Sequence, residues 1–247
     1  MVDDYATEFG RPDGPRLLYL PGLDGTGRLF HRQTDLGKSY RVLCQSYAHD
    51  KKTTYEALAE EAVSRLRDDG ADRPAVVVAE SFGGAVALTL ALLHPEWVER
   101  LVLVNTFAWY PRRFLIRAAA LLGGLSRSKP SPAFTRPFRG RFFFAPDVSR
   151  EEQNAWWERT ADVPVRAFWR RACMIARLDL RPRLGEIQVP ALVLVAADDK
   201  IVPPKAGREL AERLPHAELI ERRVGHAALV HPSVNLADLL EHWINKP

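Results

Sequence analysis

The chain has little cysteine and no long apolar run. Its 247 residues include 2 cysteines, Cys44 and Cys173, and neither has the spacing of a zinc site or a redox motif. We therefore expect both to be reduced, buried thiols. No stretch approaches the roughly 20 apolar residues of a membrane span, and the first residues lack the basic-then-apolar layout of a signal peptide. These absences predict a cytoplasmic protein.

Motifs for metals and nucleotides are also missing. His226 and His231 lie close in sequence, but no His-Glu-x-x-His pattern surrounds them, so we expect no metal site. The glycine-rich loop from Pro21 to Gly27 lacks the Gly-Lys-Ser/Thr ending of a phosphate-binding loop, which argues against nucleotide binding. The sequence thus predicts an activity that needs neither metal nor cofactor.

Acidic residues are scarce in one segment of the chain. Residues 107–184 carry 16 Lys/Arg against 6 Asp/Glu, a net charge of +10, whereas the remainder carries 19 against 25, a net charge of −6. A basic segment of this kind can attract an anionic partner. We expect peripheral contact with an anionic membrane or acyl carrier rather than with nucleic acid; the alternative is a solvated surface without a partner.

Short, fully apolar segments alternate with helical patterns along most of the chain. The apolar segments predict strands at 16–20, 40–45, 75–78, 101–104, 191–195 and 218–220. The helical patterns predict helices at 28–36, 55–66, 85–93, 209–214 and 235–244. Strands that are apolar throughout and alternate with helices predict an α/β fold, a mostly parallel sheet with helices on both faces.

The alternation breaks between residues 107 and 184. This segment holds 13 of the 23 aromatic residues, and its helical patterns cover 112–122, 150–160 and 165–178. A connection this long does not stay structureless in a compact domain. We therefore predict a helical cap, residues 107–184 (the cap segment), inserted into a core made of residues 1–106 and 185–247. Most of its aromatic side chains are expected to form the cap's own core, and some to line a pocket.

Ser81 lies in a sequence that predicts a nucleophile elbow. The apolar run 75–78 precedes Ala79-Glu80-Ser81-Phe82-Gly83-Gly84, and an apolar helical pattern follows. A strand, a small-x-Ser-x-Gly turn and a helix, in that order, expose a serine hydroxyl at a helix N-terminus. The helix dipole and free N–H groups there favour developing negative charge. Ser81 is thus the candidate nucleophile, whereas Glu80 is expected to be structural.

A serine hydroxyl needs a base to accept its proton and an acid to orient that base. The strand at 191–195 is followed by Asp198 and Asp199, and the loop after the strand at 218–220 contains His226. The carboxyl ends of parallel strands meet at one edge of a sheet. We therefore expect one of the two carboxylates to meet His226 at this edge, beside Ser81.

These motifs resemble those of the α/β-hydrolase superfamily across nearly the whole chain. In that superfamily the nucleophile, the acid and the histidine follow in this order, and the acid stands three residues after a small residue that ends its strand. Ala196 matches the small residue. The resemblance therefore implies Asp199 rather than Asp198 as the acid, with His226 as the base.

The resemblance also implies an oxyanion hole made by two backbone N–H groups, those of Phe82 and Leu23. Leu23 follows Gly22 in the loop after the first predicted strand. The chain departs from the superfamily pattern in two places, because Pro21 replaces the usual histidine before Gly22 and Ala79 replaces the first glycine of the elbow.

The function that the resemblance implies is hydrolysis of a small hydrophobic carboxylic ester through an acyl-enzyme. The loop at 20–27 and the elbow are also similar to plant and cyanobacterial lipid esterases and acyltransferases. This similarity leaves open an acyltransferase or thioesterase acting on an anionic acyl carrier or lipid. Further alternatives are a carbon–carbon bond hydrolase and a non-enzymatic ligand receptor. Dehalogenases and epoxide hydrolases of the superfamily are excluded, because they carry Asp at the elbow.

Overall fold

The computed structural model describes residues 7–68, 73–114, 116, 118 and 140–246. These residues form a seven-stranded sheet with the strand order β1-β3-β2-β4-β5-β6-β7. The strands are β1 (Glu8–Gly10), β2 (Arg16–Leu20), β3 (Arg41–Cys44), β4 (Ala75–Glu80), β5 (Val98–Val104), β6 (Ala191–Ala196) and β7 (Ala217–Arg222). β1 pairs antiparallel with β3, and the other neighbours pair in parallel. The predicted α/β fold class is thus confirmed.

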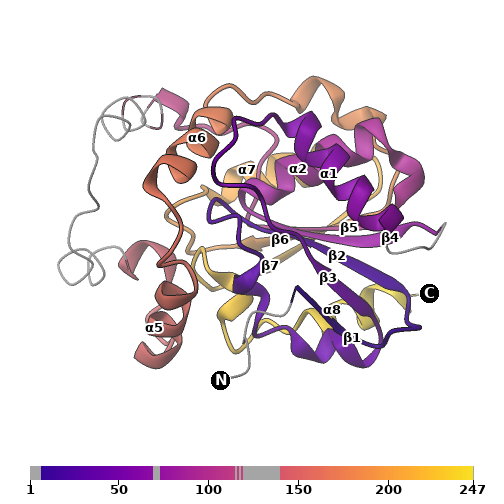
Figure 1. Cartoon of the computed structure of the whole chain (residues 1–247), viewed down its shortest axis with the longest axis horizontal. Coiled ribbons are helices and arrows are strands. Elements are labelled where there is room, and N and C mark those ends of the chain that lie inside the picture. The colour runs from indigo at the N-terminus through magenta and orange to yellow at the C-terminus, as the bar shows by residue number, and fades with distance from the viewer. Residues whose placement is uncertain (1–6, 69–72, 115, 117, 119–139, 247) are drawn as a thin grey trace.

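Helices cover both faces of this sheet (Figure 1). The α-helices are α1 (Tyr55–Asp68), α2 (Phe82–Leu93), α5 (Arg150–Arg159), α6 (Val165–Ile175), α7 (Pro204–Arg213) and α8 (Leu236–Ile244). The 3₁₀ helices are η1 (Arg28–Phe30), η2 (Thr34–Lys38), η3 (Pro95–Trp97), η4 (Arg181–Glu186) and η5 (Ala228–Val230). Helices α1, α2 and α7 pack on one face, and α8 with η1 and η2 packs on the other.

The inner strands carry long apolar runs because both of their faces are buried, as in β4 and β6. Leu18 and Val77 point into the core under α1 and α2, whereas their neighbours Leu17 and Val76 point into the core under α8. Successive side chains of a strand face opposite sides of a sheet, so a strand covered on both sides needs apolar residues at every position. The two cores together fix the sheet that carries the candidate site.

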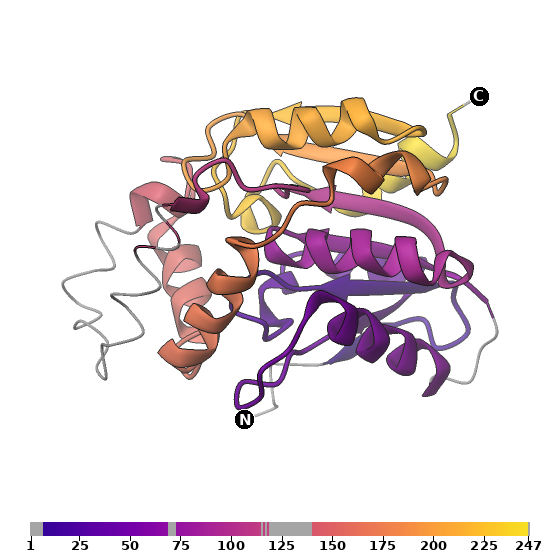
Figure 2. The ribbon, with the colours of Figure 1, turned by 90° about the horizontal axis from the view of Figure 1, so that it is seen from above.

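Helices α5 and α6 lie beyond one end of the sheet (Figure 2). α5 packs on η1, and the aromatic residues Phe144 and Trp157 form a separate buried cluster with Ala227 and Val230. The residues of the cap segment therefore contact loops that follow strands of the sheet. The division of the chain into a core and an inserted cap stays a prediction.

Several predicted elements differ from the structure in their bounds or type. The predicted helix at 28–36 is two short 3₁₀ helices, and α7 begins at Pro204 rather than at residue 209. Proline fits the first position of a helix because the N–H that it lacks has no partner there in any case. The short edge strand β1 was not predicted. Much of the predicted helix at 112–122 lies outside the described residues.

The expectation that both cysteines are buried is wrong for one of them. Cys44 is buried in β3, as predicted, but Cys173 is exposed. Cys173 lies on α6, whose buried side consists of Ala167, Arg171, Ala172 and Ile175. A helix turns by about 100° per residue, so Cys173 falls on the outer side of α6.

Candidate active site

Ser81 occupies a strained turn between β4 and α2. Its φ of 53° is positive, and its backbone is held by hydrogen bonds from its N–H to the Val104 carbonyl oxygen (2.9 Å) and from Thr106 Oγ1 to its own carbonyl oxygen (2.5 Å). A Cβ added to Gly83 would lie 2.2 Å from the Leu20 carbonyl oxygen. This close approach explains why glycine stands two residues after Ser81. This tight, strained turn brings the serine to the N-terminus of α2.

Asp199 and His226 form a buried hydrogen-bonded pair. Asp199 Oδ2 lies 2.7 Å from His226 Nδ1, and both residues are 7% exposed. The other oxygen, Oδ1, accepts hydrogen bonds from the N–H groups of Ile201 (2.7 Å) and Val202 (2.9 Å). These bonds fix the carboxylate, which in turn orients the imidazole. Asp198, the other carboxylate considered, is exposed.

Asn105 joins the loops that carry this pair. It follows β5 with a φ of 47°, and its side-chain Nδ2 donates to the His226 carbonyl oxygen (2.8 Å). Its Oδ1 accepts from the N–H of Ala196 at the end of β6 (2.8 Å). One amide therefore links the strand end before Asp199 to the loop of His226. Sequence reasoning missed this residue, although its position directly after a strand was a usable signal.

Ser81 is buried in the same region, at 6% exposure. Among the described residues, no hydrogen bond joins its hydroxyl to His226. Catalytic hydrogen bonds in unliganded enzymes are often long and tighten only when substrate binds. The serine–histidine contact that a triad requires therefore stays a prediction.

The loop after β2 lies against the elbow. A Cβ added to Gly22 would lie 3.7 Å from Ser81 Cβ, so the neighbouring Leu23 amide is close to the nucleophile. Within the described part of the chain, the N–H groups of Leu23 and Phe82 have no hydrogen-bond acceptor. Two unpaired N–H groups beside a serine are the arrangement that an oxyanion hole needs.

Burial and charge shift the pKa values of two groups beside Ser81. Burial lowers the pKa of His226, but the Asp199 carboxylate and, to a smaller extent, Glu80 outweigh it, so the net shift is upward. Burial raises the pKa of Glu80 to about 7, although His226 and the hydroxyl of Tyr19 favour its charged form. Tyr19 donates to Glu80 Oε2 at 3.0 Å. Glu80 is thus an interior carboxyl that is electrostatically linked to His226.

An aromatic cluster from the cap segment lies against His226. The ring centroid of Phe143 lies 5.8 Å from that of the His226 imidazole and 5.1 Å from that of Trp156. The ring centroids of Trp156 and Trp157 are 4.6 Å apart. The carbonyl oxygen of Phe143 also accepts from the N–H of Ala227 (2.8 Å). Most of these rings pack on one another, and Phe143 presents an apolar surface beside His226.

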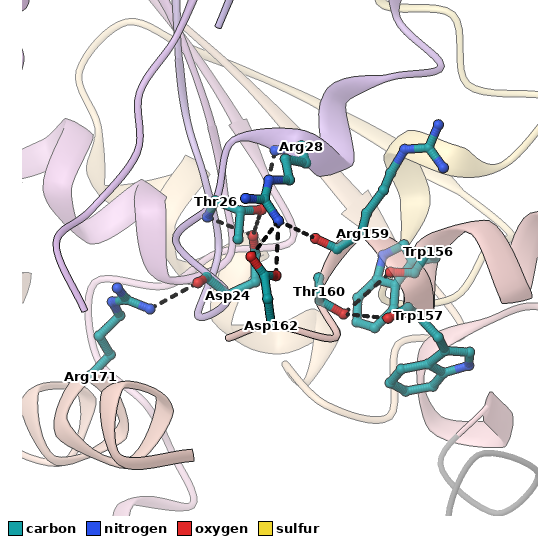
Figure 3. A network of polar contacts seen from close by, with 9 residues as sticks. All are labelled: Asp24, Thr26, Arg28, Trp156, Trp157, Arg159, Thr160, Asp162 and Arg171. Carbon is teal, nitrogen blue, oxygen red and sulfur yellow. Dashed lines mark hydrogen bonds and ion pairs between the residues drawn. The ribbon is translucent and has the colours of Figure 1, made fainter. Parts of the chain in front are cut away.

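A polar network connects the loop after β2 to the turn between α5 and α6 (Figure 3). Arg28 Nη1 lies 2.8 Å from both carboxylate oxygens of Asp162, and Asp24 Oδ2 accepts from the N–H and the hydroxyl of Thr26 (2.8 and 2.6 Å). The same loop accepts hydrogen bonds from Arg171 of α6. Sequence reasoning missed Arg171, and no local pattern marked it.

Among the described residues, no group of three or more His, Cys, Asp or Glu side chains is placed to hold a metal ion. No helix of that part of the chain has both the length and the apolar composition that crossing a bilayer requires.

Comparison with known proteins places this geometry in a family. The sequence profile of a family described as "Serine aminopeptidase, S33" matches residues 45–222. A Serratia proteamaculans protein named "Putative carbamate hydrolase RutD" is 30% identical over 253 residues, which cover 95% of this chain and 92% of the relative. The Arabidopsis thaliana "Phytyl ester synthase 1, chloroplastic" is 38% identical over 109 residues, covering 42% of this chain and 16% of that protein.

A solved structure shares the whole fold. The crystal structure of a hydrolase from Pseudomonas aeruginosa superposes with a TM-score of 0.86 at 21% identity, covering 97% of this chain and 93% of that one. The profile match spans well over half of this chain, and the RutD relative is covered almost completely. The chain therefore belongs to the α/β-hydrolase superfamily, in the family described as serine aminopeptidase S33, and is a hydrolase of this type.

Proposed function

We propose that the protein hydrolyses carboxylic esters of hydrophobic acids through an acyl-enzyme. Ser81 attacks the ester carbonyl while His226 accepts its proton, and Asp199 holds the imidazole in the required tautomer. The N–H groups of Leu23 and Phe82 stabilise the oxyanion. His226 then protonates the leaving alcohol and activates the water that releases the acid. The observation that carries the proposal is the buried 2.7 Å contact between Asp199 and His226 on loops beside the strained Ser81 elbow.

The nature of the substrate is proposed from the apolar surface next to the base. Phe143 faces His226, and its neighbours in the cap segment are aromatic. Such a surface favours a short or medium apolar acyl group over a charged one.

The test is turnover of p-nitrophenyl butyrate by wild type and by Ser81→Ala. We expect the substitution to lower kcat by about 10⁴-fold or more, because nucleophile and base act as a unit. Ser46→Ala is the matched control, since Ser46 is exposed and lies outside the site. Activity that survives in Ser81→Ala would refute the assignment of the nucleophile.

A fluorophosphonate probe separates an enzyme from a ligand receptor on the same fold. The probe should modify wild type at Ser81 and leave Ser81→Ala unmodified, as judged by intact mass. An unmodified wild-type protein would favour a receptor, because a pocket without an activated serine does not react covalently.

Carbamate hydrolysis is a second candidate, and the name of the Serratia relative favours it. The same residues would open a carbamate by attack of Ser81 on its carbonyl. Comparing kcat/KM for p-nitrophenyl butyrate and for a p-nitrophenyl N-alkylcarbamate of equal length decides between them. A higher value for the carbamate would replace the ester proposal.

Acyl transfer is a third candidate, because one stretch of the chain matches the phytyl ester synthase. It requires an alcohol to replace water at the acyl-enzyme. Formation of a new ester when a long-chain alcohol is added to the butyrate assay would support it.

A further inference from the structure

Arg171 is a buried cation that points from α6 into the loop after β2. Only 2% of the residue is exposed. Its Nη1 donates to the carbonyl oxygens of Leu23 (2.8 Å) and Asp24 (2.9 Å), and Figure 3 shows the bond to Asp24. Its Nη2 lies 3.2 Å from the Tyr47 carbonyl oxygen and 2.9 Å from His49 Nδ1. All these acceptors are uncharged when His49 is neutral.

Burying a guanidinium against neutral acceptors costs desolvation free energy. The bonds that Arg171 makes must therefore offset this cost or serve the site. Burial lowers the pKa of Arg171, and the nearby Asp24 carboxylate only partly offsets this effect. A planar group with five N–H donors can hold carbonyls of two separate segments at once. Here the two segments are the loop after β2 and the chain after β3.

The contacts of Arg171 restrain the peptide groups next to the Leu23 amide. The bond to the Leu23 carbonyl oxygen fixes the plane of the peptide that follows Leu23, and the N–H of Gly25 donates to the Gly22 carbonyl oxygen at 3.1 Å, closing the turn. The Leu23 N–H belongs to the same peptide group as the Gly22 carbonyl, so the bond from Gly25 restrains it on one side and the bond from Arg171 restrains the next peptide group. An oxyanion donor is effective only when it is oriented before the reaction begins.

The guanidinium packs directly against Gly25. The φ of Gly25 is +67°, and a Cβ at this position would lie 2.5 Å from Arg171 Cζ. Any larger residue at position 25 would therefore collide with the arginine. By contrast, the Arg28–Asp162 pair, which also joins this loop to the cap segment, is partly exposed, with side-chain exposures of 29% and 60%. Exposed ion pairs of this kind contribute little to the free energy of folding.

We propose that Arg171 is a positioning residue of the oxyanion hole: it holds the turn Gly22–Gly25 so that the Leu23 N–H points at the developing oxyanion. Catalysis thereby depends on α6, a helix of the cap segment. The inference rests on the proposed function, because it assigns a supporting residue to the same site.

The test compares Arg171→Met, Arg171→Lys and the control Arg170→Gln with p-nitrophenyl butyrate. Arg170 lies on the same helix but donates to the carbonyl oxygens of His49 and Asp50, away from the turn. We expect Arg171→Met to lower kcat by about 10- to 100-fold with KM changed less than about threefold, since it weakens one oxyanion donor. Arg171→Lys should recover part of the loss, and Arg170→Gln should match wild type.

A second readout separates positioning from general stability. An alkylboronic acid forms a tetrahedral adduct with the serine, so its affinity should fall with kcat in Arg171→Met, while the urea midpoint is measured in parallel. If Arg171→Met does not fold, Gly25→Ala serves instead, because its methyl group displaces the guanidinium from the other side. It should lower kcat and boronate affinity together.

The outcomes distinguish this inference from the function on which it rests. Wild-type kcat and boronate affinity in a folded Arg171→Met or Gly25→Ala protein would overturn the role of Arg171 alone. A fall in kcat that is matched by Arg170→Gln would also overturn it. Failure of wild type both to cleave the ester and to react with the fluorophosphonate would overturn the proposed function, and this inference with it.

Discussion

Glu80 precedes Ser81 in the chain and is the residue whose charge we expect to influence the base. His226 must be neutral to accept the serine proton, so activity falls as the pH drops through its pKa. Burial lowers that pKa, but Asp199 and Glu80 together raise it above its ordinary value. The acid limb of kcat/KM should therefore lie at a higher pH than an ordinary histidine would give.

Replacing Glu80 by Gln removes one of the negative charges that raise the pKa of His226. We expect the acid limb of the kcat/KM profile for p-nitrophenyl butyrate to move to lower pH, because the imidazole then loses its proton more readily. Glu60→Gln is the control, since its exposed side chain pairs with His94, far from the site. An unmoved limb, or one displaced to higher pH, would show that Glu80 has no such effect.

The residues located from the sequence follow a strand and also match a turn motif or the superfamily pattern, whereas Asn105 follows β5 but matches neither. The positions of Ser81, Asp199 and His226 came from strand order and from a turn motif, which depend on neighbours in the chain. Asn105 and Arg171 act through partners that are distant in sequence: Asn105 bonds the His226 loop, and Arg171 bonds the turn after β2. Such partners depend on how the elements pack in space, and no local periodicity encodes them.

At the scale of elements, inner strands such as β4 and β6 were predictable because full burial on two faces leaves an unbroken apolar run. Boundaries were less predictable. α7 begins at Pro204 rather than at the predicted residue 209, and η1 and η2 replace the helix expected at 28–36. 3₁₀ turns and helix starts depend on tertiary contacts more than on composition.

The contact between the His226 loop and the cap segment leads to a further prediction. A Cβ added to Gly225 would lie 2.7 Å from the Phe143 carbonyl oxygen and 2.8 Å from the Ala145 N–H nitrogen, and both are backbone atoms. Gly225→Ala must therefore separate the two segments. We expect a loss of about 1–3 kcal/mol in unfolding free energy and a fall in kcat, measured by urea denaturation and by ester turnover.

Gly185→Ala is the matched control for this substitution, because a Cβ there would meet no atom within 4 Å. It should leave stability and kcat unchanged or raise stability slightly. Equal behaviour of the two variants would mean that the approach of Phe143 to Gly225 has no role in holding His226.

At the scale of the whole molecule, charge is unevenly distributed. Among the described residues of the cap segment there are eleven arginines against six acidic residues. Several of these arginines bond to carbonyl oxygens, as Arg170 and Arg171 do, and such bonds leave the positive charge in place. α5 and α6 lie beyond the end of the sheet where the candidate site is formed (Figure 2). The positive field therefore acts on molecules that approach this end.

This field should distinguish anionic from neutral substrates. We expect kcat/KM for mono-p-nitrophenyl succinate to fall as salt is raised, by several-fold over a range that shortens the Debye length from about 30 Å to about 3 Å. The value for neutral p-nitrophenyl butyrate, which has the same leaving group and acyl length, should stay constant. Arg166→Glu combined with Arg177→Glu, both exposed on or just after α6, should flatten the succinate response. If both esters responded equally to salt, the charge of the cap segment would be a solvated surface without influence on the site, and an anionic acyl carrier would lose its electrostatic rationale.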